Sequence, residues 1–126
     1  MKVSSHLTKA FMLIWLLSAC AHDTLGPKID TSSKISKQEF ISRFGFPKCA
    51  VSVPLTLYEA VKGAELVGAP QIDQRIDWIE MIKIMEPGDE LRNVWCVPRR
   101  GPGGVDIIGL FRNSKLIAEV HTVFMD

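Results

Sequence analysis

The sequence predicts an α+β fold, in which two or three short helices pack on one face of a three-stranded antiparallel β-meander. Apolar residues recur at helical spacing as far as Met85, whereas from Leu91 they follow the period of two that is typical of strands. The chain has 126 residues, of which 47% are hydrophobic and 23% are charged, and this composition is that of one folded domain.

Two of the expected helices begin with a capping box, in which a Ser or Thr side chain and a Glu three residues later satisfy each other's backbone N–H groups. Ser36 and Glu39 predict a helix over 37–44, and Thr56 and Glu59 predict a helix over 57–66. Gly63 lies within the second of these helices and weakens it by about 1 kcal/mol relative to Ala.

A third helix is expected between Asp73, which can cap it, and Pro87, which stops it. Its apolar surface is unusually wide, which indicates burial in the core or contact with a partner. The residues of this surface are Ile76, Trp78, Ile79, Met81, Ile82, Ile84 and Met85.

Strands are expected over 91–97, 105–112 and 115–124, after a short extended run at 49–53. Asn113-Ser114 fits a two-residue hairpin turn. That turn predicts the pairs Arg112–Lys115, Phe111–Leu116 and Ile107–Val120. The face expected to pack on the helices carries Val105, Ile107, Phe111, Leu116, Ala118, Val120 and Phe124, and the opposite face carries Asp106, Ile108, Leu110, Ile117, Glu119 and His121. Because this opposite face is also apolar, an earlier segment or a partner is expected to cover it.

The N-terminus combines two lysines, Lys2 and Lys9, with an apolar stretch over 10–19 that ends in Leu17-Ser18-Ala19-Cys20. Such a stretch is too short for a mature membrane-spanning helix, which needs about 20 residues, and has the length of a signal-peptide core. The small residues Ser18 and Ala19 suit a peptidase cleft, and the Cys20 thiol can carry a thioether-linked lipid.

These residues resemble the lipobox of the bacterial lipoprotein precursor family. The resemblance implies cleavage before Cys20, a diacylglycerol on its sulfur and acylation of its new amino group. In Gram-negative members of the family, Asp directly after the lipidated cysteine favours retention in the inner membrane. Ala21 occupies that position here, which implies an outer-membrane anchor facing the periplasm. The alternative is an ordinary secretory signal with a chance cysteine.

The expected organisation is therefore a signal peptide over 1–19, a lipidated tether over 20–36 and a single domain over 37–126. The apolar residues Leu25 and Ile29 leave open that part of the tether packs on the domain.

After lipidation of Cys20, only Cys49 and Cys96 remain for the folded domain. An oxidising compartment favours a disulfide between them, and two buried free thiols are the alternative. Neither a CxxC nor an HxxxH spacing occurs, and no metal or cofactor is expected.

The predicted register places Asp106 opposite His121, with Cys96 on a neighbouring strand. A Cys/His/Asp constellation is one reading of this group, with Glu119 as a further polar residue nearby. The other reading is an exposed cross-strand ion pair, and a disulfide would consume the thiol. The expectation is a protein that is not an enzyme, with a hydrolase left open.

The loop over 99–104 (RRGPGG) has neither the GxxxxGK[ST] pattern of a phosphate-binding loop nor a helix after it. It reads as a basic hairpin loop that can contact an anionic lipid or a protein partner.

One further likeness is weaker. Thr56 and Val61, the turn over 66–70 and the later strands are faintly similar to the small lipoproteins that assist outer-membrane barrel assembly, a likeness of fold alone. Val67 interrupts that family's Leu-Gly-x-Pro turn, and the third helix separates the turn from the strands.

The near balance of 15 Lys and Arg against 14 Asp and Glu excludes the basic field of a nucleic-acid binder. The expected function is a small membrane-anchored envelope lipoprotein with a non-enzymatic protein-interaction role. Its expected contact surface comprises Arg99, Arg100, Ile108, Leu110 and Ile117. The alternatives are an inhibitor or immunity-type lipoprotein that blocks a periplasmic hydrolase or toxin, and an accessory factor of outer-membrane assembly.

Overall fold

A computed structural model describes the backbone of residues 27–125 and the side chains of residues 27–122. The predicted signal peptide, the lipidation site Cys20 and the first part of the tether lie outside the described residues.

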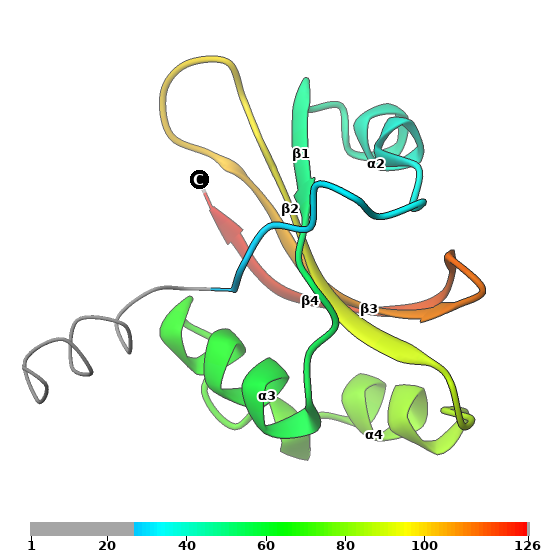
Figure 1. The fold of residues 1–126 in the computed structure, drawn as a ribbon. Coiled ribbons are helices and arrows are strands. Elements are labelled where there is room, and N and C mark those ends of the chain that lie inside the picture. Colours follow the sequence, from blue (N-terminus) through cyan, green and yellow to red (C-terminus); the bar gives the residue numbers. More distant parts are fainter. Residues whose placement is uncertain (1–26, 126) are drawn as a thin grey trace, which may run out of the picture.

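The domain is α+β, with a four-stranded antiparallel sheet in the order β1-β2-β3-β4 (Figure 1). The strands are β1 (Lys48–Val51), β2 (Glu90–Val97), β3 (Gly104–Arg112) and β4 (Lys115–Met125). The helices are α2 (Lys37–Phe44), α3 (Leu57–Leu66) and α4 (Ile76–Lys83), with the 3₁₀ turn η1 (Ile72–Gln74) between the last two.

The sheet has one strand more than the predicted three-stranded meander. The additional strand is β1, which pairs with β2 from Lys48–Val97 to Val51–Val94. Its four residues are a short extended run in the sequence, and their partners lie more than forty positions later. Local periodicity carries no information about a pairing of that range.

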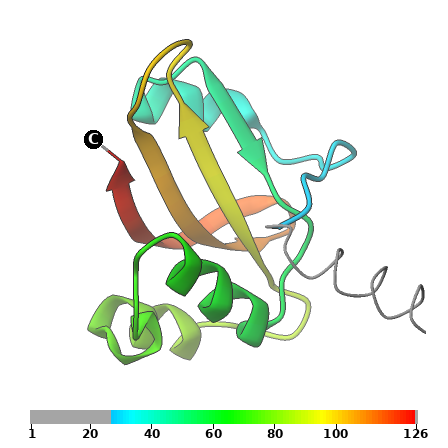
Figure 2. The same ribbon diagram turned by 90° about the vertical axis from the view of Figure 1, so that its left-hand side faces the viewer.

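Both faces of the sheet are covered, whereas the sequence predicted helices on one face only. Figures 1 and 2 show α3 and α4 against one face and α2 against the other. Strand β3 explains this arrangement, because its residues from Gly104 to Phe111 are all buried. A strand that is buried along its length needs cover on both sides.

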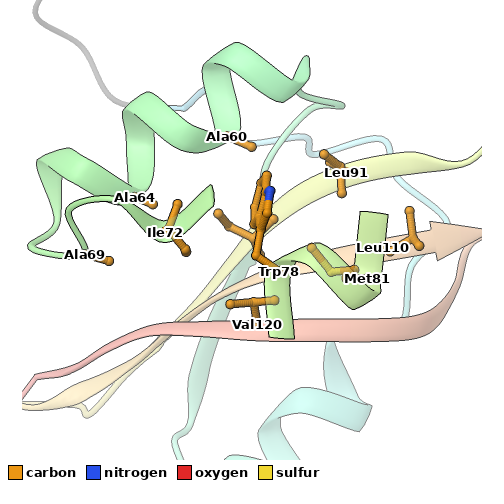
Figure 3. Close-up of a cluster of buried hydrophobic side chains, with 10 residues drawn as sticks. Ala60, Ala64, Ala69, Ile72, Trp78, Met81, Leu91, Leu110 and Val120 are labelled. Atoms are coloured by element: carbon orange, nitrogen blue, oxygen red, sulfur yellow. The ribbon is translucent and has the colours of Figure 1, made fainter. Parts of the chain in front are cut away.

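The core on the α3 and α4 side centres on Trp78, which is 4% exposed and points from α4 between α3 and the sheet (Figure 3). Leu91, Ile108, Leu110 and Val120 supply the sheet side of this core. From the helical side, the small residues Ala60 and Ala64 let α3 approach closely.

The core on the α2 side joins Phe40 of α2 and Ile35 to residues from three strands. These strand residues are Val51, Val94, Cys96, Val105, Ile107 and Phe111. Phe40 meets Phe111 edge-on, with ring centroids 6.3 Å apart.

The hairpin turn is confirmed, because Asn113 and Ser114 adopt φ values of 52° and 64°, as the favoured two-residue turn requires. The pairs Arg112–Lys115 and Phe111–Leu116 are also confirmed. The third predicted pair is wrong, since Ile107 pairs with His121 and Ile108 pairs with Val120.

Two register shifts, each adding one residue to β4, cause this difference. They lie between Leu110 and Phe111 and between Asp106 and Ile107 on β3, opposite Ile117 and Thr122 on β4. One extra residue moves the following side chains to the other face of the sheet. Ala118 and Val120 accordingly pack on the α3 and α4 side. The residues that were predicted to share a face with them pack on the α2 side instead, namely Val105, Ile107, Phe111 and Leu116.

The helices predicted at 37–44 and 57–66 have the predicted bounds. Both bonds of the Thr56–Glu59 capping box are present, at 3.1 and 3.0 Å, whereas the Ser36 side chain makes no cap bond. The third helix is shorter than expected. Its N-cap position is Arg75, whose side chain makes no cap bond, and Asp73 lies in η1.

Residues 27–36 run along the domain. Ile29 forms a bridge with Ser52, and Ile35 is buried under α2. The carboxylate of Asp30 accepts a 2.7 Å hydrogen bond from Arg92, which lowers the pKa of Asp30 to about 2. This ion pair fixes the described part of the tether to β2.

Cys49 and Cys96 are directly opposite each other in the β1–β2 ladder, and their sulfur atoms lie 2.05 Å apart, at disulfide distance. The bond links residues 47 positions apart and joins the edge strand to the centre of the sheet.

Replacement of both cysteines (Cys49→Ala with Cys96→Ala) is expected to lower the free energy of unfolding. The chain-entropy cost of a loop of this length is about 4 kcal/mol, which sets the upper limit of the loss. Urea unfolding of the oxidised protein, the reduced protein and the double variant measures it. Equal midpoints for all three would contradict a structural disulfide.

Candidate ligand-binding site

An open, mainly apolar groove of about 470 Å³ runs along one side of α3. Five helix residues spaced on one face form one wall, namely Tyr58, Glu59, Lys62, Gly63 and Leu66. Pro27, Lys28, Val53 and Leu55 form the other wall. This second wall is held in place by backbone bonds, because the Val53 N–H donates to the Lys28 carbonyl at 2.8 Å and the Leu55 N–H donates to the Leu91 carbonyl at 2.7 Å.

A smaller hollow, with room of about 10 Å³, lies beneath α3 and shares Pro27, Leu55 and Gly63 with the groove. Its remaining lining comes from the inner side of α3 and from the sheet, namely Ala60, Ala64, Asn93, Asp106, Ile108 and Thr122. The shared residues make the groove and the hollow neighbours, and polar groups of the sheet line the hollow.

Those polar groups form a hydrogen-bonded row across the sheet. The Ser52 hydroxyl accepts from the Asn93 N–H at 2.9 Å, and the Asn93 side-chain amide donates to Oδ1 of Asp106 at 2.9 Å. The Thr122 hydroxyl donates to the same Oδ1 at 2.7 Å. Thr122 reaches Asp106 because the second register shift adds one residue to β4 at this position.

Asp106 is the charged member of the row and is only 7% exposed. Burial raises the pKa of its carboxyl group, and the hydrogen bonds from Thr122 and Asn93 offset part of that effect. A buried carboxyl group with a raised pKa at a cavity is a candidate functional group.

The Cys96/His121/Asp106 constellation is not assembled. Cys96 lies at disulfide distance from Cys49 and belongs to the α2-side core, whereas Asp106 lines the hollow on the α3 side. His121 pairs opposite Ile107 and packs edge-on against Phe44 of α2, with ring centroids 5.9 Å apart. The sheet therefore separates Asp106 from His121.

His121 and Glu119 instead form a cluster on the α2 side. Nε2 of His121 lies 3.0 Å from a carboxylate oxygen of Glu119, and Glu119 also pairs with Arg43 of α2. This cluster ties α2 to β4, with Arg43 placed over the Phe44 ring at 5.0 Å from its centroid.

The predicted contact surface is only partly exposed. Arg99 and Arg100 are exposed in the loop at the end of the sheet opposite α3 and α4 (Figure 2), and Ile117 is 38% exposed. The prediction was wrong for Ile108 and Leu110, which are 2% and 0% exposed because α3 and α4 cover them.

The apolar surface that is exposed lies mainly on the helical layer. The residues of this layer with large exposed apolar side chains are Leu57, Tyr58, Leu66, Val67, Ile76, Ile79 and Ile84. Leu66 of α3 is 82% exposed, and Ile76 of α4 is 75% exposed. For Ile76 this differs from burial in the core, which was one of the two readings of the wide apolar surface of the third helix.

Sequence reasoning missed Asn93, Thr122 and the groove. Asn93 shares one face of β2 with the apolar residues Leu91 and Trp95. A polar residue at such a position was the available signal of a polar partner inside the sheet. The role of Thr122 depends on a register shift that no residue type announces.

Comparisons with models of protein families, with curated proteins and with solved structures gave no significant match to this chain. Within residues 27–125, no helix has the length and apolar character needed to cross a membrane. In the same part of the chain, no three His, Cys, Asp or Glu side chains come together as metal ligands do.

The variant Asp106→Asn tests the burial of this carboxylate. Because the pKa of Asp106 is raised in the folded state, the folded protein binds more protons than the unfolded chain above pH 3.8, and its stability falls as the pH rises through the raised value. The variant lacks this fall. The melting temperature of Asp106→Asn minus that of the wild type is therefore expected to increase as the pH rises from 4 to neutrality.

Melting curves across this pH range measure the difference. Asp73→Asn, which removes an exposed carboxylate, is the control for the change in net charge. A constant difference between Asp106→Asn and the wild type at every pH would show that burial does not penalise the charge.

Proposed function

We propose that this chain is a membrane-anchored lipoprotein of the bacterial envelope whose domain has a non-enzymatic, protein-binding role. The Leu17-Ser18-Ala19-Cys20 sequence supports the anchor, with Ala21 favouring the outer membrane on its periplasmic side. Cys49 and Cys96 at disulfide distance fit the oxidising compartment that such a location implies. A lipid anchor concentrates the domain at the membrane surface and so favours binding to other envelope proteins.

The observation that carries the binding role is the exposed apolar surface of the helical layer. Isolated apolar side chains are normal on protein surfaces, but here most of the large exposed ones belong to one part of the fold, residues 57–84. Such a concentration is typical of a surface that a partner covers.

The charge of this layer favours a protein over a lipid surface. Residues 57–86 contain six acidic and three basic side chains. Anionic lipids attract basic surfaces and repel acidic ones. The helical layer is therefore proposed to bind a protein, with apolar contacts at its centre and a rim of matching charge.

A second candidate is the inhibitor or immunity-type lipoprotein, and the loop between β2 and β3 favours it. Arg99 and Arg100 are exposed there, beyond the end of the sheet and away from the helical layer (Figure 1). A projecting basic loop suits insertion into an acidic cleft of a hydrolase or toxin.

Photo-crosslinking in the native membrane distinguishes these roles. A photoreactive residue placed at Ile76, which is 75% exposed, is expected to capture one defined envelope protein. The same residue at Ile117, which is 38% exposed on β4 outside the helical layer, is the matched control and is expected to capture none. Ile76→Asp in the same assay is expected to reduce capture from a probe at Leu66 by at least about tenfold, the effect of losing about 1.4 kcal/mol of binding free energy.

Capture from Arg99 or Arg100 but not from Ile76 would contradict the role of the helical layer and support the inhibitor. Capture of a barrel-assembly component from Ile76 would support the accessory role in outer-membrane assembly. Cys20→Ala is the control for the anchor, since it is expected to lose acyl labelling and crosslinking together. Normal processing and membrane association of Cys20→Ala would contradict the anchor itself.

A further inference from the structure

We propose that the groove beside α3 and the hollow beneath it form one site for a primary ammonium group carried at the end of an unbranched apolar chain, with Asp106 as the counter-ion. The groove shares Tyr58 and Leu66 with the exposed helical layer, but the test of this proposal requires neither the anchor nor the partner proposed above.

The first argument is the pairing of the buried carboxylates. Asp30, Asp89 and Glu119 all have largely buried side chains, and each pairs with an arginine. Asp106 is buried to the same degree, but its only donors among the described residues are the neutral side chains of Asn93 and Thr122. Both of them donate to Oδ1, and no described residue donates to Oδ2.

A buried carboxylate without a cation is costly, because the charge loses its hydration and gains little in return. The arrangement becomes favourable when a ligand brings a positive charge to Oδ2. Since Asp106 lines the hollow, the ligand cation can reach it without a change in the sheet.

The second argument is Gly63, which lies in the middle of α3 and lines both the groove and the hollow. Glycine costs about 1 kcal/mol relative to Ala in a helix interior. Its backbone is ordinary helix, and a Cβ atom added at this position would meet nothing within 4 Å. The fold therefore does not require glycine here, whereas the absence of a side chain leaves open the wall that the groove and the hollow share.

The size of the two cavities selects the ligand. The hollow has room of about 10 Å³, which accommodates one group the size of a water molecule, such as an ammonium, and not a planar guanidinium. The groove of about 470 Å³ has Val53, Leu55 and Leu66 among its walls and suits an alkyl chain.

The outer part of the groove adds one further restriction. Lys28 and Lys62 both line it, together with Glu59. A second positive charge at the far end of the ligand is therefore disfavoured, and a neutral or anionic end is accepted. A free alkylamine and the lysine side chain of a protein both meet this description.

The probe is n-pentylamine, added to the full-length chain and followed through the backbone NMR signals of Gly63, Asn93 and Asp106. It is expected to shift these signals saturably and to bind at least about tenfold more tightly than n-pentanol, which has the same chain length without the charge. Asp106→Asn is expected to abolish the preference for the amine.

Gly63→Leu tests the open wall that the groove and the hollow share. Leucine is a good helix former and its Cβ meets no neighbour, so this variant is expected to keep or raise the melting temperature while it weakens pentylamine binding at least about tenfold. Glu65→Leu adds the same side chain on the same helix outside the groove lining, and its pentylamine affinity is expected to match that of the wild type within twofold.

A parallel titration with Nα-acetyl-lysine methylamide identifies the source of the ammonium. Binding that depends on Asp106 supports the lysine of a partner protein, whereas binding of pentylamine alone supports a free amine. Equal affinity for pentylamine and pentanol, undiminished binding by Asp106→Asn, or no binding of either amine would overturn the proposal.

Discussion

The sheet of this domain is apolar on both faces, and the need to cover both of them decides the rest of the architecture. Strand β3 is buried from Gly104 to Phe111, so no single helical layer can satisfy it. The chain places α2 and Ile35 on one face and α3 with α4 on the other. The Cys49–Cys96 pair and the Arg92–Asp30 ion pair fix the edge strand and residues 27–36 to this frame.

The groove arises where this cover ends. Helix α3 closes over the sheet with small residues on its inner side, and its outer side leaves a trough against Pro27 and Leu55. Directly beneath, the row from Ser52 to Thr122 places polar side chains inside an otherwise apolar layer. Local rules of folding are broken at two positions here, by the buried carboxylate of Asp106, which pairs with no cation among the described residues, and by a glycine in a helix at Gly63. Departures of this kind concentrate at functional sites.

The sequence alone predicted those elements whose signals are local. The helices at 37–44 and 57–66 followed from capping-box patterns and breakers, and the β3–β4 turn followed from the tolerance of Asn113 for positive φ. The third helix was predicted too long, because Asp73 lies in the 3₁₀ turn η1, which ends at Gln74, and the α-helix begins only at Ile76.

What could not be predicted depends on long-range register. No residue type marks the extra residues Ile117 and Thr122, yet each changes the face of the side chains that follow it. For this reason Asp106 and His121, which were expected to face each other, lie on opposite sides of the sheet. Ile108 and Leu110 were expected at the surface because helices were predicted on one face only, and they lie in the core because α3 and α4 cover their face. The candidate site was therefore visible in the sequence only as Asp106, without Asn93, Thr122 or the groove.

The titration of the Asp106 side-chain carboxyl carbon by ¹³C NMR tests the central claim most directly, because it reports the charge of the buried group itself. In the free protein the midpoint is expected above 3.8, the ordinary value for an aspartate. In the presence of saturating pentylamine it is expected to move down, since a bound ammonium favours the charged form. A midpoint at or below 3.8 in the free protein, unchanged by the amine, would contradict the account.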